Sequence, residues 1–160
     1  MIEEWSEFHV AMAGATAALA GLVIVAASVN IAEIVKSRTL TARLLAGIAA
    51  LLLALTVCAL GLVPHIDDIW FGALTIVATL LAAVFQVDVT RLIARDRSPA
   101  DRAKPLKYLI GFLPIAAYLA AGTAVVLQHP SGMYLAAAGC VLAVVSAIVV
   151  SWVALVEVLR

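Results

Sequence analysis

The sequence predicts an all-α, polytopic integral membrane protein with five transmembrane helices, an external N-terminus and a cytoplasmic C-terminus. Three observations predict it: the composition, the length of the apolar stretches and the placement of the positive charges. Of the 160 residues, 66% are hydrophobic and 12% are charged. Soluble domains are only about 45–50% apolar and about 25% charged. Little sequence remains for a soluble domain, so residues 1–160 are predicted to form a single transmembrane domain.

The first apolar stretch sets the pattern for the rest of the chain. No charged residue occurs from Val10 to Val29. At about 1.5 Å rise per residue, a helix of this length crosses the roughly 30 Å hydrocarbon core of a bilayer. Four further stretches of similar length follow, separated by short polar or Pro-containing connections. The predicted spans are residues 10–29, 44–63, 69–87, 108–127 and 133–156.

Positive charge is confined to one side of the predicted membrane. With five spans, all ten Lys and Arg residues fall on the side of the C-terminus. The opposite side has Glu3, Glu4, Glu7, Asp67 and Asp68 instead. Cytoplasmic loops carry the excess of Lys and Arg, so the C-terminus is predicted to be cytoplasmic. A four-span or six-span chain would break this separation. The Ala-rich, Arg-biased composition suggests the plasma (inner) membrane of a bacterium.

The first span has a polar face with a seven-residue repeat. His9, Thr16, Val23 and Asn30 recur at this spacing, and Glu33 follows Asn30 by one turn. Polar groups within a span usually face protein or water. In a symmetric oligomer this face would surround a shared axis, which makes these five residues the predicted pore-lining set. The alternative is structural: Glu33 pairs with Lys36 or Arg38, and Asn30 caps the end of the helix.

A second face of the same span consists mostly of small residues. Gly14, Gly21 and Ser28 lie on it. Small residues let helix backbones approach closely in a membrane. We therefore expect this face to pack against a neighbouring helix.

The third span contains a secondary polar stripe. Thr75, Thr79 and Gln86 follow helical spacing. They are candidates for a hydrophilic lining. Alternatively, the Thr hydroxyls bond to their own helix and Gln86 bonds across to another helix.

No motif for a catalytic site or a cofactor is present, so the protein is not predicted to be an enzyme.

His9, His65 and His129 all fall on the external side, near Glu7, Asp67 and Asp68. Their spacing matches no metal motif, and the sequence leaves metal binding open. The formal net charge is zero, which gives no support for a nucleic-acid partner.

Three classes of function fit this pattern. The first is a small homo-oligomeric channel, lined by the first helix, that conducts inorganic ions and favours cations through Glu33. The second is a non-conducting accessory or scaffold subunit that binds another membrane protein. A secondary transporter ranks third, because no intramembrane charge pair marks a midplane site. The lipid bilayer and further copies of the chain are the expected partners.

Overall fold

The computed structural model describes residues 2–95 and 104–158. Every element in this part of the chain is helical, which confirms the predicted all-α class. In order they are a 3₁₀ helix η1 (Ile2–Trp5), α1 (Ser6–Val29), α2 (Ile31–Ile34), α3 (Arg38–Gly61), α4 (Asp68–Arg95), α5 (Lys104–Val126) and α6 (Ser131–Val158).

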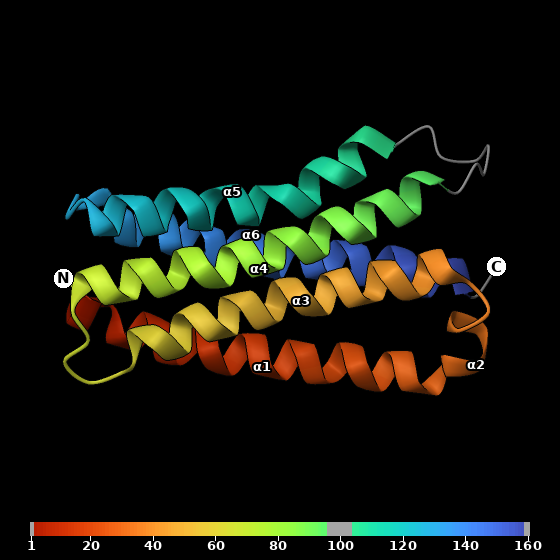
Figure 1. The fold of residues 1–160 in the computed structure, drawn as a ribbon. Helices are drawn as coiled ribbons and strands as arrows, with labels where there is room; N and C mark the ends of the chain where they lie inside the picture. Colours follow the sequence, from red (N-terminus) through yellow and green to blue (C-terminus); the bar gives the residue numbers. More distant parts are fainter. Residues whose placement is uncertain (1, 96–103, 159–160) are drawn as a thin grey trace.

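The five long helices run along one bundle, with the two termini at opposite ends (Figure 1). The N-end of the bundle holds the N-terminus and the connections at residues 62–67 and 127–130. The C-end holds the connection at residues 35–37 and the C-terminus. α3 contacts α1, α4 and α6, while α5 packs on α4 and α6. α1 therefore lies at the edge of the bundle, joined to it mainly through α3.

Four helices of the described chain are long and apolar enough to cross a membrane. They are Ile2–Val29, Arg38–Gly61, Asp68–Ile93 and Ser131–Val153. The apolar part found in α5, Ile110–Val126, is shorter. Large apolar side chains point out of the bundle, among them Leu22, Leu81 and Trp152, which are 65%, 69% and 70% exposed. Such an apolar exterior suits lipid rather than water, and the protein is a multi-pass membrane protein.

The helices extend beyond the predicted spans at the C-end. α3 begins at Arg38, six residues before the predicted start, because the Ser37 side chain caps it by accepting the N–H of Leu40 at 3.4 Å. α4 continues to Arg95, past the predicted end at residue 87. The predicted spans are shorter because hydropathy detects only the apolar part of a helix. The same helix can continue for further, polar turns beyond the hydrocarbon core of the membrane. Most of the predicted connection between the third and fourth spans that remains beyond α4 lies outside the described residues.

The core of the N-end half is filled by side chains from four helices. Val57, Phe71, Tyr118, Val125 and Met133 are each at most 1% exposed and belong to one cluster. Since α3, α4, α5 and α6 all contribute, this cluster fixes their relative positions. The candidate site lies in the other half of the bundle, toward the C-end.

Candidate functional site

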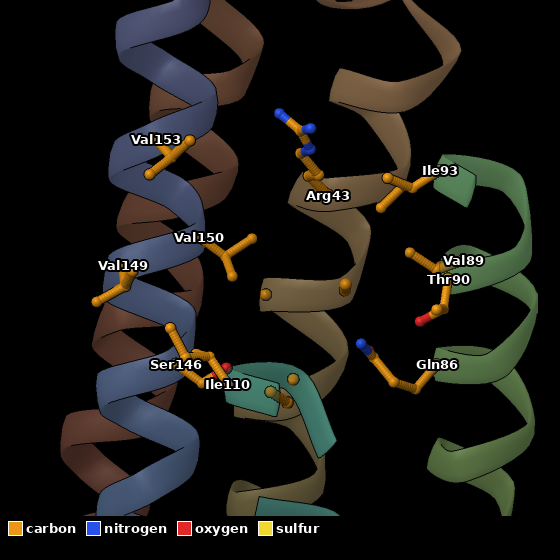
Figure 2. Close-up of a pocket in the computed structure, with 14 residues that line it drawn as sticks. Arg43, Gln86, Val89, Thr90, Ile93, Ile110, Ser146, Val149, Val150 and Val153 are labelled. Carbon is orange, nitrogen blue, oxygen red and sulfur yellow. The ribbon is translucent and has the colours of Figure 1, made fainter. Parts of the chain in front are cut away.

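A pocket of about 70 Å³ lies in the C-end half of the bundle, among α3, α4, α5 and α6. Figure 2 shows Arg43, Ile93 and Val153 at one end of it and Gln86, Ser146 and Ile110 at the other. Most of the lining is aliphatic. Small-molecule sites in proteins are commonly lined in this way, by apolar side chains with a few polar groups.

Glycines create the space on two walls. A Cβ on Gly47 would lie 3.3 Å from Ser151 Oγ, so α3 and α6 approach closely beside the pocket. A Cβ on Gly111 would collide with Gln86 Nε2. Gln86 therefore reaches from α4 to the α5 backbone at Gly111. Figure 2 shows its side chain pointing into the pocket. Its amide is one of the few polar groups available to a pocket occupant.

Buried hydroxyl groups continue from the pocket toward the N-end. Thr75 and Thr79 are both fully buried, and Thr79 Oγ1 donates to the Thr75 carbonyl at 2.6 Å. The structure thus places all of the secondary polar stripe inside the bundle or at its pocket. Thr79 makes the bond to its own helix that the structural alternative expected.

Some buried polar atoms in this interior have no hydrogen-bond partner. They are Oγ1 of Thr75, the Tyr118 hydroxyl and Oγ of Ser151. An unpaired polar group away from water costs about 1–3 kcal/mol by mutational data. Sites that retain such groups commonly take up water or a solute.

The predicted pore-lining face of α1 turns toward the protomer's own helices. His9 is 2% exposed and Thr16 is fully buried. A Cβ on Gly61 of α3 would lie 2.5 Å from His9 Nε2, and the His9 ring centroid is 6.1 Å from that of Phe71. Thr16 Oγ1 donates to the Met12 carbonyl at 2.7 Å. The N-end part of this face is therefore buried inside the protomer and does not face a second copy.

The remaining residues of that face lie toward the C-end. Val23 is half-buried and packs against the Ile34 and Leu44 pair. Asn30 Nδ2 donates to the Ala26 carbonyl at 3.2 Å, where α1 ends. Glu33 is exposed and paired with Lys36 at 2.6 Å. These contacts are those of the structural alternative, and they place the Glu33 carboxylate on the surface.

The small-residue face of α1 is open. Gly14 and Gly21 are exposed, and a Cβ on either would have no heavy atom within 4 Å. Ser28 is also exposed, and its hydroxyl donates to the Val25 carbonyl at 2.7 Å. No helix of the described protomer covers this face, so the helix neighbour expected there would belong to another molecule.

Sequence reasoning missed Tyr118 and Arg43. Tyr118 occurs in the middle of a predicted span, whereas Tyr is usually enriched at the membrane interfaces, and that position was an available signal. Arg43 gave no such signal, because only the packing of α3 shows that it borders a pocket.

The comparison with family models gives one assignment. The model of a family of unknown function, DUF7994, matches residues 2–104. No curated protein matches the chain, and no solved structure does. The family match runs from η1 to the first residue of α5, which is more than half of the chain. The protein therefore belongs to this family of unknown function, DUF7994.

Proposed function

We propose that the protein is a small membrane channel whose path lies inside each protomer. One observation carries the proposal: buried polar side chains without partners continue the C-end pocket toward the N-end. In a membrane interior such groups are costly, and water or a permeating ion would pair them. This path replaces a shared axis along α1, because His9 packs against α3 and Thr16 is fully buried within the protomer.

The path is closed in this conformation. Phe71 and Val125 are at most 1% exposed and fill the bundle on the N-end side of Thr75. Conduction therefore requires their displacement, in the manner of hydrophobic constrictions that gate by wetting. Glu33 is on the surface, paired with Lys36, and does not line the pocket, so Glu33→Gln is expected to change ion preference little.

The proposed topology has five spans, with α5 as the fifth, an external N-end and a cytoplasmic C-end. Two features support it. The termini lie at opposite ends of the bundle, as an odd number of crossings requires. Lys36, Arg38 and Arg91 belong to C-end segments, in accordance with the positive-inside rule. The bacterial inner membrane is the matching location.

Conductance of the purified protein in planar bilayers tests the channel. Thr75→Val removes an unpaired hydroxyl from the path at nearly constant volume, and we expect it to lower single-channel conductance several-fold. Thr56→Val is the matched control, because Thr56 is exposed and its hydroxyl bonds back to Leu52 at 2.7 Å. It should conduct like wild type. Equal currents from both variants would contradict a path past Thr75.

A second candidate is an accessory subunit that binds another membrane protein or further copies of itself. The open face of α1 favours it, since Gly14 and Gly21 leave room for a close helix neighbour. Gly21→Leu should then disrupt assembly, measured as particle size in nanodiscs, while Leu22→Ile on the exposed surface should not. Absence of current together with loss of assembly in Gly21→Leu would favour this reading over the channel.

A further inference from the structure

The C-end pocket is long and narrow, and it runs along the bundle. Its lining extends over residues 43–50 of α3, 86–93 of α4 and 146–153 of α6. Each of these intervals is two helical turns, or about 10 Å of rise. One water-sized group needs about 10–15 Å³ of such a pocket, so the volume of about 70 Å³ holds roughly five to seven of them. Spread over two turns, this is the space of a single chain of atoms.

The pocket is polar at both ends and mostly apolar between them. Arg43 supplies a positive charge at the C-end mouth, while Gln86 and Ser146 supply an amide and a hydroxyl at the inner end (Figure 2). The walls between are aliphatic, as at Val89, apart from the Thr90 hydroxyl. A row of waters would find few hydrogen-bond partners along such walls, so they favour a hydrocarbon chain. An occupant that matches the whole pocket is charged at one end, apolar in the middle and polar at the other end.

The charge at the mouth selects a carboxylate. A guanidinium has five N–H donors in a planar fork, which matches the two oxygens of a carboxylate and leaves donors for other partners. It keeps its proton in proteins, so the positive charge of Arg43 is permanent. No Asp or Glu is present among the described residues that line the pocket. A bound carboxylate would therefore meet no like charge on the walls.

We propose that the C-end pocket binds a medium-chain carboxylic acid with a hydroxyl group at its far end. The carboxylate pairs with the Arg43 guanidinium, the methylene groups lie between the aliphatic walls, and the hydroxyl bonds to the Gln86 amide beside Ser146. An amide offers both a donor and an acceptor to such a hydroxyl. A methylene group is close to water in size, so the five to seven groups that fit, with the carboxylate beyond them, give a chain of about eight carbons.

The pocket also belongs to the proposed conduction path, but binding does not depend on conduction. A chain bound between Arg43 and Gln86 would fill the C-end part of that path and close it. The binding experiment below measures no current, so the channel and the ligand site can each fail alone.

The test is equilibrium dialysis of radiolabelled 8-hydroxyoctanoate against the full chain in nanodiscs. Empty nanodiscs of the same lipid give the partition into the bilayer, which is subtracted. We expect one saturable site per protomer. Octanoate lacks the terminal hydroxyl and 1,8-octanediol lacks the carboxylate, so each should compete roughly tenfold more weakly. Absence of saturable binding would overturn the proposal, as would competition by either analogue that equals that of unlabelled 8-hydroxyoctanoate.

Two sets of variants assign the ends of the ligand. Arg43→Gln should weaken binding of 8-hydroxyoctanoate roughly tenfold and remove its advantage over 1,8-octanediol. The double variant Gln86→Met/Ser146→Ala removes the polar groups of the inner end and nearly keeps their volume. It should leave the advantage over 1,8-octanediol and remove the advantage over octanoate. An unchanged ligand preference in both sets would contradict the assignment.

Arg91→Gln is the matched control for charge. Arg91 is another C-end arginine, but it is exposed, lies 3.6 Å from Asp88 and does not line the pocket. This variant should bind 8-hydroxyoctanoate like wild type. Equal weakening by Arg43→Gln and Arg91→Gln would mean that the anion is attracted by the general charge of the C-end, and would overturn the site. If Arg43→Gln does not fold, the wild-type comparison with 1,8-octanediol decides whether the carboxylate is recognised.

Discussion

At the scale of single residues, the absence of a side chain at Gly61 lets His9 of α1 pack directly against α3. A Cβ at this position would lie 2.5–2.9 Å from three atoms of the His9 ring. The imidazole therefore seats directly on the last turn of α3. This contact connects α1 to the bundle at the N-end, and it keeps His9 away from lipid.

Gly61→Ala should destabilise the protein by about 1–3 kcal/mol, because the added methyl group overlaps a buried ring. Thermal unfolding in detergent measures the effect. Gly14→Ala is the control: no atom lies within 4 Å of its Cβ position, and the better helix propensity should stabilise it by up to about 1 kcal/mol. Equal stability of the two variants would mean that His9 does not rest on Gly61.

The sequence allowed us to predict which residues share a helix face. It did not allow us to predict what each face packs against. The sequence placed His9 and Thr16 on one face of the first helix, and they do share a face. It did not predict that the face meets α3, because apolar residues surround the helix and no single side is marked as internal. Gly14 and Gly61 look alike in the sequence, yet one is exposed and the other is covered by a ring.

At the scale of elements, α4 and α5 meet through a pair of glycines. A Cβ on Gly72 would lie 2.9 Å from the Gly122 carbonyl oxygen, and one on Gly122 would lie 3.0 Å from that of Gly72. Two backbones approach this closely only where neither residue has a side chain. Dispersion contacts along the shared length then stabilise the helix pair in place of a hydrophobic driving force.

Gly122→Val should separate α4 from α5 and lower the free energy of unfolding by about 3 kcal/mol, since the new atoms meet backbone that cannot move aside. Chemical denaturation in mixed micelles measures it. Gly21→Val, on the open face of α1, is expected to change stability far less. A small effect at Gly122 would show that the two helices do not touch at this point.

The number and order of the long helices follow from hydropathy, and all five predicted segments lie within or close to observed helices. Their ends depend on local chemistry that hydropathy does not register, such as the Ser37 cap of α3. The pocket was not predicted, because it depends on how four helices are placed relative to one another. No pattern of residues along a single helix indicates that placement. Two residues of the predicted stripe, Thr75 and Thr79, lie in the interior, while Gln86 reaches the pocket.

At the scale of the whole molecule, the two ends of the bundle differ in charge and face different compartments in the proposed topology. Pro130→Cys, in the N-end connection between α5 and α6, should react with a membrane-impermeant thiol reagent in intact cells. Lys36→Cys, at the C-end, should react only after permeabilisation. Cys58 and Cys140 are buried and give little background. Labelling in the opposite order would invert the proposed orientation.

The pattern of helix contacts also bears on how the protein is made. α1 meets α3, the next long helix; α3 meets α4, α4 meets α5, and α5 meets α6. Each can form as soon as the newer segment leaves the ribosome and enters the bilayer. The docking of α6 on α3 is different, since it joins segments separated by two whole helices. That contact must wait until α6 has entered the bilayer, and it is the one that brings the thiol of Cys58 to that of Cys140. Among the helix contacts named here, the one that closes this dithiol would thus form last.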